Sequence, residues 1–86
     1  MEKPGTTPTK LIVYLAFTRD EEGELRPAFD AREAQSESAA KQQARILWSS
    51  GKYVGVVAWS RSADLVNGEF GEPVVLYREG DVPDME

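Results

Sequence analysis

The sequence predicts an α+β fold in which one helix packs on one face of a four-stranded antiparallel sheet. Two strongly apolar segments, residues 11–17 and 53–60, have the branched and aromatic composition of strands. Between them, residues 36–50 repeat apolar side chains at helical spacing. A sheet that carries one helix is the natural packing of such elements. We expect the chain order β-β-α-β-β and the spatial strand order 2-1-3-4. A β-grasp-like order, 2-1-4-3, is the alternative and would pair the first and last strands in parallel.

The first two strands are predicted to form a hairpin. Residues 1–9 are rich in proline, glycine and threonine and are expected to be a flexible N-terminal arm. Residues 10–18 carry apolar side chains at odd and even positions, which is typical of a central strand, and the odd positions make the more apolar face. After the polar turn at residues 19–24, residues 25–30 return as a second strand. Pro27 places this strand at an edge, because proline has no N–H to donate.

Two sequence signals compete for the start of the helix. Residues 30–33 have the form of a capping box, and Ser36 followed by Glu37 offers a second cap with an acid in the first turn. The helical wheel fits the later start, because extending its apolar stripe backwards places the earlier alanines on the polar side. We therefore predict a helix over residues 36–50, with Gly51 as its C-terminal stop.

The second half of the chain is predicted to supply the other two strands. Residues 53–60 form the third strand. Residues 61–73 contain several turn signals and are expected to be a long connection to the fourth strand at residues 74–78. The last residues, 80–86, are expected to be an acidic C-terminal tail. The folded domain then spans residues 10–79.

The composition excludes several classes of function. The chain contains no histidine and no cysteine, so it lacks the side chain that titrates nearest neutral pH and the commonest soft nucleophile and metal ligand. Ten basic and fifteen acidic residues give a net charge of −5, which disfavours nucleic acid and anionic membranes as partners. The longest apolar run is far shorter than the roughly 20 residues that span a bilayer. We expect a cytoplasmic protein that uses no cofactor and is not an enzyme.

Three short motifs resemble functional sites but fit structural roles better. The acidic turn at residues 20–24 fails the EF-hand pattern at its sixth and twelfth positions, so we expect a solvated hairpin tip and no metal site. Gly51-Lys52 follows the predicted helix, whereas a phosphate-binding loop precedes its helix. Trp59 and Arg61 have the residue types of a ligand-binding corner. A tryptophan that closes the core beneath a cation–π contact with Arg61 is the favoured interpretation.

The second face of the sheet is the most informative feature, because one helix covers only one face. The helix is expected to cover Leu11, Val13, Leu15, Val54, Val56, Val74 and Leu76. The other face then carries Ile12, Tyr14, Tyr53, Val57, Trp59, Val75 and Tyr77, more apolar surface than a monomer normally exposes. Two interpretations stay open. Either this face binds another chain, a second copy included, or residues 61–73 and the chain ends fold over it, with Leu65, Phe70 and Val82 as the cover.

The leading functional hypothesis is a non-catalytic protein-interaction module. It would bind an unknown protein partner or form a homodimer through its open sheet face or an edge strand. The candidate interaction surface consists of Tyr14, Tyr53, Val57, Trp59, Arg61 and Tyr77. An alternative is a small-ligand binder or minor enzyme with a pocket between residues 61–73 and the sheet. A third hypothesis, a nucleic-acid mimic or a binder of a basic partner, rests on the net charge alone.

Several segments of the chain carry a resemblance to a known group. They are residues 55–61 (GVVAWSR), 68–73 (GEFGEP) and 80–84 (GDVPD), together with residues 16–17 and 35–37. In these segments the chain resembles a small family of uncharacterised bacterial proteins, found mostly in alphaproteobacteria, including rhizobia and their relatives. The resemblance covers most of residues 10–86. That family has no assigned activity, so the resemblance implies a small bacterial cytoplasmic protein and carries over no functional residue.

Overall fold

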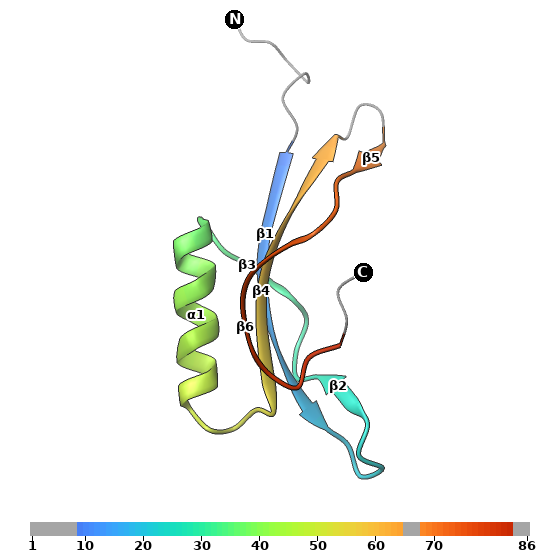
Figure 1. Ribbon diagram of the computed structural model, residues 1–86, viewed down its shortest axis with the longest axis vertical. Coiled ribbons are helices and arrows are strands. Elements are labelled where there is room, and N and C mark those ends of the chain that lie inside the picture. The colour runs from blue at the N-terminus through green and yellow to red at the C-terminus, as the bar shows by residue number, and fades with distance from the viewer. Residues whose placement is uncertain (1–8, 65–67, 84–86) are drawn as a thin grey trace, which may run out of the picture.

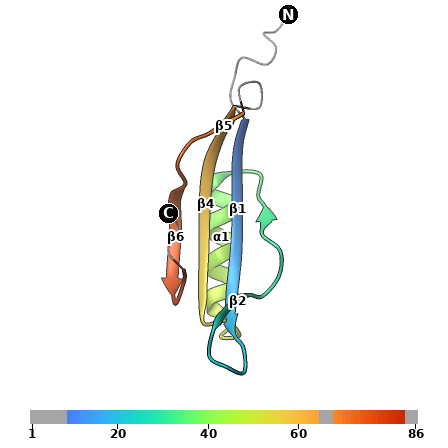
Figure 2. The same cartoon turned by 90° about the vertical axis from the view of Figure 1, so that its right-hand side faces the viewer.

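The computed structural model of the protein describes residues 9–64 and 68–83. Within these residues, six strands form one antiparallel sheet, and a single helix, α1, lies against one of its faces (Figure 1). The α+β class and the one helical layer are therefore confirmed. Figure 2 looks at the opposite face, with α1 behind the strands. No helix of the described residues covers that face.

Two long strands, β1 (Thr9–Arg19) and β4 (Gly55–Asp64), form the antiparallel centre of the sheet. Their register pairs Phe17 with Gly55 at one end and Thr9 with Ala63 at the other. Both strands are rich in β-branched and aromatic residues, which suit a pleated surface packed on both sides. The prediction that these two segments are the central pair is confirmed.

Each long strand has two shorter partners along its outer edge. β2 (Leu25–Pro27) and β3 (Arg32–Glu33) pair with β1, while β5 (Glu69–Phe70) and β6 (Val74–Gly80) pair with β4. The sheet order is β2-β1-β4-β5, with β3 also beside β1 and β6 also beside β4. The predicted four-strand order, 2-1-3-4, differs from this order in detail, because each outer position of the sheet holds two strands instead of one. The β-grasp-like alternative, which places the last strand between the first and the third, is wrong: β1 pairs directly with β4, and β6 pairs with β4 only.

Pro27 explains why the outer position beside β1 is divided. Proline has no N–H, so the ladder has no donor at this residue. The next amide, Ala28 N, donates to Ala16 O at 2.9 Å, and the chain leaves the ladder soon afterwards. It returns through β3, beyond which Ala34 N donates to Ile12 O at 2.8 Å. The predicted strand over residues 25–30 therefore ends early, although its place at the edge is confirmed.

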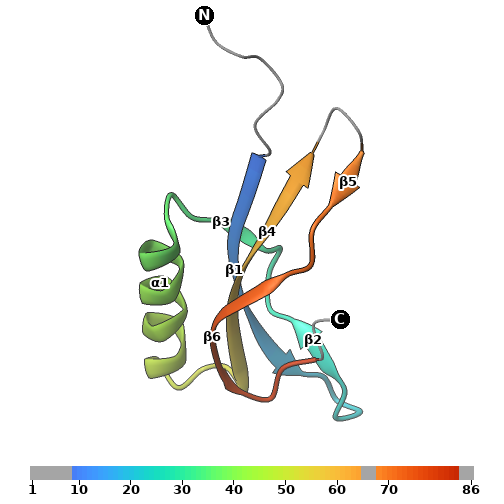
Figure 3. The ribbon, with the colours of Figure 1, turned by 45° about the horizontal axis from the view of Figure 1, so that its top comes forward.

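The segment expected to be a long connection, residues 61–73, extends the sheet instead. β4 continues to Asp64, and Gly68, with a φ of +72°, leads into β5. β5 returns along β4 with Phe70 opposite Ala63, and the β4–β5 hairpin projects past the end of α1 (Figure 3). The described part of this segment lies in the sheet and not across its second face. Leu65, one of the residues expected to cover that face, lies outside the described residues.

The helix α1 (Glu37–Ser49) begins and ends where the sequence predicts. Ser36 is the N-cap: its backbone is extended, and its hydroxyl accepts a hydrogen bond of 3.0 Å from Ala39 N. At the other end the chain turns at Gly51, whose φ of +76° favours glycine. The competing start at residues 30–33 is wrong, because this segment contains β3.

The core between helix and sheet is built around small residues. Ala40 and Ala44 of α1 are fully buried against Ala16 of β1 and Ala58 of β4. Since these side chains are single methyl groups, the helix backbone approaches the sheet closely. Val56 of β4 completes the fully buried cluster, and the other large side chains fill its margins. The margin residues include Ile12, Tyr14, Phe29, Leu47, Trp48, Tyr53, Leu76 and Tyr77.

The prediction of which face meets the helix is wrong for β1 and for several other positions. The helix covers the even positions of β1, which present Ala16 between Ile12 and Tyr14. The displaced residues, expected beneath the helix but found on the other face, are Leu11, Val13, Leu15 and Val54. Tyr53 and Tyr77 make the opposite exchange. The physical reason is shape: the alanine stripe of α1 requires small residues beneath it, and these lie on the less apolar face of β1.

A β-bulge in β6 brings two consecutive side chains to the helix side. Ala58 pairs with Tyr77 and Trp59 pairs with Val75, which leaves Leu76 as the extra residue. Leu76 and Tyr77 consequently both pack against the helix-side core. Strict alternation along a strand would have placed one of them on each face. The bulge also keeps Val75 on the same face as Trp59.

Candidate interaction surface

The sheet face opposite α1 is called the open face here. Its side chains follow from the strand register, since residues directly opposite one another on neighbouring strands point to the same side. They include Leu11, Val13, Leu15 and Phe17 of β1, Glu33 of β3, Val57, Trp59, Arg61 and Ala63 of β4, and Val75 and Arg78 of β6. Figure 2 views the molecule from this side.

One half of the open face is covered by residues 81–83, which we call the C-terminal strap. Val82 of the strap is only 8% exposed and packs in a cluster with Phe17 and Val57. Val82 thus provides part of the cover that the sequence suggested for this face. Other side chains packed against this cluster are Leu15, Leu25, Val54 and Trp59.

Three polar contacts hold the strap in place. The backbone N–H of Asp81 donates to the Val54 carbonyl at 2.8 Å, which continues the edge of the sheet by one bond. The Asp81 carboxylate pairs with the Arg19 guanidinium at 2.9 Å. Arg78 Nη2 donates to the Val82 carbonyl at 3.2 Å. The expected tail at residues 80–86 is therefore part of the folded unit as far as Pro83, and residues 84–86 lie outside the description.

The other half of the open face, called the bare patch, is formed by Leu11, Val13, Trp59 and Val75. Trp59 lies opposite Val13 on one side and Val75 on the other, so three apolar side chains cross the sheet in one row. Trp59 marks the boundary with the strap cluster, against which it packs. Leu11, Val13 and Trp59 are half-buried, whereas Val75 is 43% exposed.

Charged side chains border the bare patch. Arg61 lies beside it on β4, next to Leu11 in register, and its Nε donates to the Gly71 carbonyl at 2.8 Å. Arg78 lies on β6, opposite Val57. Glu33, on β3, borders the patch at its opposite side. All three residues are exposed. The apolar row is thus framed by two cations and one anion in a chain whose net charge is −5.

The six residues predicted to form the interaction surface do not share one face. Val57 lies on the open face, but it is fully buried beneath its neighbours. Trp59 and Arg61 lie at the bare patch. The remaining three pack in the helix-side core: Tyr14, Tyr53 and Tyr77.

The aromatic rings on the helix side make contacts within the molecule. The rings of Phe29 and Tyr53 meet edge to face, with centroids 6.2 Å apart. The Arg32 guanidinium lies 4.2 Å from the centroid of Phe29, and that of Arg45 lies 5.9 Å from the centroid of Tyr77. These contacts account for Tyr53 and Tyr77, two of the aromatic residues that sequence reasoning had assigned to binding.

Sequence reasoning missed three residues of the bare patch: Leu11, Val13 and Val75 were not among the candidates. A signal for the first two was present, because the odd positions of residues 11–17 are the more apolar set. The alanines of α1 gave a second signal, since a small helix stripe demands small partners in the sheet. Val75 was placed on the correct face but was not counted as a binding residue.

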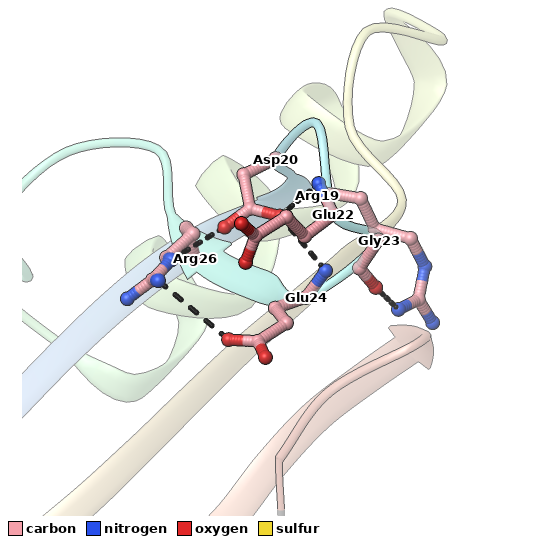
Figure 4. A network of polar contacts seen from close by, with 6 residues as sticks. All are labelled: Arg19, Asp20, Glu22, Gly23, Glu24 and Arg26. Atoms are coloured by element: carbon pink, nitrogen blue, oxygen red, sulfur yellow. Dashed lines mark hydrogen bonds and ion pairs between the residues drawn. The ribbon is translucent and has the colours of Figure 1, made fainter.

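The acidic turn between β1 and β2 is organised by one carboxylate (Figure 4). Asp20 Oδ1 accepts hydrogen bonds from the backbone N–H groups of Glu22 and Glu24, at 2.9 and 3.0 Å. Its Oδ2 pairs with Arg26 Nε at 2.9 Å. The hydrogen bond from Glu24 N, followed by that from Arg26, lowers the pKa of Asp20 below its usual value. The turn is an exposed hairpin tip whose central acid has a structural role.

Two further observations bear on the class of site. Within the described residues, no group of three or more Asp, Glu, His or Cys side chains is placed to hold a metal ion. In the same residues, no helix has the length and apolarity needed to cross a membrane.

Comparisons of the chain with models of protein families, with curated proteins and with solved structures find no match. The resemblance to a family of alphaproteobacterial proteins is not tested by them and stays a prediction.

Proposed function

We propose that the protein is a non-catalytic interaction module that binds another polypeptide chain through the bare patch of its open face. The observation that carries this proposal is the row formed by Val13, Trp59 and Val75 across three neighbouring strands. Val13 and Trp59 lie on the two central strands of the sheet and are only half-buried. Val75 lies on the outer strand β6 and is exposed.

The chemistry of the row suits protein binding. Tryptophan is enriched at the energetic centres of protein interfaces, because it buries a large area while losing few rotamers. Arginines at the margin of such a centre are enriched as well, since the guanidinium both stacks and donates several hydrogen bonds. The bare patch combines Trp59 with Arg61 and Arg78 at its border.

The polar side chains of the described residues support a non-catalytic role, because the prominent ones have structural partners. Asp20 organises the β1–β2 turn. Lys10 pairs with Glu37 and joins β1 to the first turn of α1. A catalytic acid or base would instead need a site that shifts its pKa towards the working pH. The lowered pKa of Asp20 and that of Glu37 move away from neutrality.

An affinity pull-down with paired baits tests the proposal. The wild-type chain is compared with Trp59→Ala, which removes the centre of the row, and with Val75→Glu, which places a charge on an exposed position and leaves the buried clusters intact. We expect a binding partner, confirmed with the purified components, that the wild type retains and both variants lose. Circular dichroism of each bait shows whether it is folded.

The proposal fails if neither a different protein nor a further copy of the chain binds in a manner sensitive to these substitutions. Val74→Glu is the matched control, because Val74 is 57% exposed and its register with Ser60 places it on the opposite side of β6. This variant is expected to bind as the wild type does.

A further inference from the structure

We infer that the polypeptide bound at the bare patch is a second copy of this chain, arranged so that the strap of each copy covers the bare patch of the other. The inference rests on the proposed function and adds the identity and the orientation of the partner. It follows from the shape of the open face, from its charges and from its area.

The open face has a raised half and a bare half. The strap lies on the half that contains Phe17 and Val57, whereas the row of Val13, Trp59 and Val75 has no such layer among the described residues. A twofold axis that lies in the interface and runs perpendicular to the strands exchanges these two halves. Each raised strap then meets the bare patch of its partner. A C2 interface of this kind is self-complementary, since the same surface is used twice.

A twofold axis parallel to the strands would not give this fit. It would place each half of the open face opposite the same half of the other copy, so one strap would meet the other strap. The sheets would then be held apart over both bare patches. Because well-packed interfaces leave few voids, the perpendicular axis is the arrangement that the relief of the face favours.

One pair of opposite charges is brought together under the same axis. The strap carries Asp81, whose side chain is 59% exposed even though it pairs with Arg19. The bare patch is bordered by Arg61, in an exposed residue. The perpendicular axis brings Asp81 of one copy towards Arg61 of the other, twice. Opposite potentials of this kind set the register of an interface more than its affinity.

The area of the face sets the expected strength. The face is about four strands wide, at about 4.8 Å per strand, and about eight residues long, at about 3.3 Å per residue. Its area is therefore roughly 500 Å² per copy. Two copies would bury about 1,000 Å², which lies at the lower limit for specific interfaces. We therefore expect a reversible dimer whose population rises with protein concentration.

The first experiment measures molar mass by sedimentation equilibrium over a wide concentration range. The wild type is compared with Val75→Glu and with the matched control Val74→Glu. An unpaired carboxylate at the bare patch is expected to weaken dimerisation by roughly 10- to 100-fold, because a buried charge lacks its hydrogen bonds with water. The control should dimerise as the wild type does.

The second experiment tests the orientation. The chain contains no cysteine, so a single introduced thiol reacts alone. One chain carries Val75→Cys at the bare patch, and another carries Pro83→Cys on the strap, where Pro83 is exposed. With a short thiol-specific cross-linker, the mixture should give a cross-linked heterodimer in much higher yield than either chain alone. A mixture of Val74→Cys with Pro83→Cys should not.

The outcomes separate this inference from the proposed function. A wild-type chain that is monomeric at every concentration overturns the inference, as does a dimer that Val75→Glu leaves unchanged. If the pull-down nevertheless returns a different protein that requires Trp59, the proposed function stands and only the identity of the partner is wrong. A dimer sensitive to Val75→Glu that shows no preference for the mixed cross-link overturns the orientation.

Discussion

Gly55 lies with its Cα directly against the backbone of Asp81, so that the first residue of β4 supports the strap. A Cβ placed on Gly55 would clash with the Asp81 carbonyl, reaching 2.6 Å from the carbonyl carbon and 2.9 Å from the nitrogen. Backbone atoms on both sides of this contact belong to paired segments and cannot move independently. The absence of a side chain at Gly55 is therefore a condition for the strap to lie where it does.

Gly55→Ala is expected to lower the free energy of unfolding by about 1–3 kcal/mol, because a methyl group is forced into a filled space. Urea unfolding followed by circular dichroism measures this change. Gly71→Ala is the control, since a Cβ there would meet Ser62 atoms at an ordinary 3.5–3.8 Å. Equal stability of the two variants would contradict the close approach of Gly55 and Asp81.

Gly80→Ala should be more destabilising than Gly51→Ala. The two glycines have nearly the same positive φ, +74° and +76°, so the backbone strain of about 1–2 kcal/mol is shared. They differ in surroundings: a Cβ on Gly80 would lie 2.7–2.8 Å from the ring of Trp48, whereas a Cβ on Gly51 would meet nothing within 4 Å. The difference between their unfolding free energies isolates the clash from the strain, and a difference near zero would contradict it.

Val82→Ala should lower the unfolding free energy by about 1–2 kcal/mol, at roughly 0.8 kcal/mol for each buried methylene equivalent. Val82 is 8% exposed in the strap cluster. Val74→Ala removes the same atoms from a side chain that is 57% exposed and should change stability much less. Thermal unfolding of the two variants gives the comparison. If Val74→Ala costs as much as Val82→Ala, the strap does not pack as described.

Protonation of Asp20 and Glu37 in acid is expected to lower the free energy of unfolding. Hydrogen bonds and a nearby cation lower the pKa of Asp20 from its ordinary 3.8, chiefly through Glu24 N and then Arg26. The hydrogen bond from Lys10 lowers the pKa of Glu37 from its ordinary 4.5. A folded-state pKa below the unfolded one means that the unfolded chain binds more protons in this range. The contribution is thus fully present above about pH 4.5 and is lost as the pH falls through the folded pKa values.

Asp20→Asn should flatten this acid-dependent loss of stability, because the variant has no carboxylate to protonate at the turn. Urea midpoints of wild type and variant, measured between neutral pH and pH 3, give the comparison. Glu21→Gln is the control: it makes the same change in net charge at an exposed neighbour. A control that flattens the profile as much as Asp20→Asn would assign the effect to overall charge.

Most of the fold could be predicted because local signals and burial agree. The cap at Ser36 and the stop at Gly51 set the ends of α1, and the two apolar segments could hardly lie anywhere but at the centre of the sheet. The division of the outer strands was not predicted. Pro27 was recognised as an edge residue, but the short return to the ladder at β3 depends on how Ala28 and Phe29 pack against the helix-side core.

The candidate surface was predicted less well, because the choice of face is a property of two elements together. Counting apolar residues along β1 favours its odd positions for the helix, yet the helix takes the face that presents Ala16. In β6 the bulge at Leu76 breaks the alternation on which every assignment of sides depends. Trp59 was assigned to the correct face, because the pairing of β4 with β1 is regular and the side chains from Val56 to Trp59 alternate between the two faces.

The two tryptophans of the chain lie on opposite sides of the sheet, Trp48 in the helix-side core and Trp59 beside the strap cluster. The molecule thus has a native fluorophore in each of its layers. With Trp48 replaced by phenylalanine, the emission of Trp59 would report on the open face alone. With Trp59 replaced, the emission of Trp48 would report on the packing of α1 against the sheet. Loosening of one layer before the other could then be timed without any attached dye.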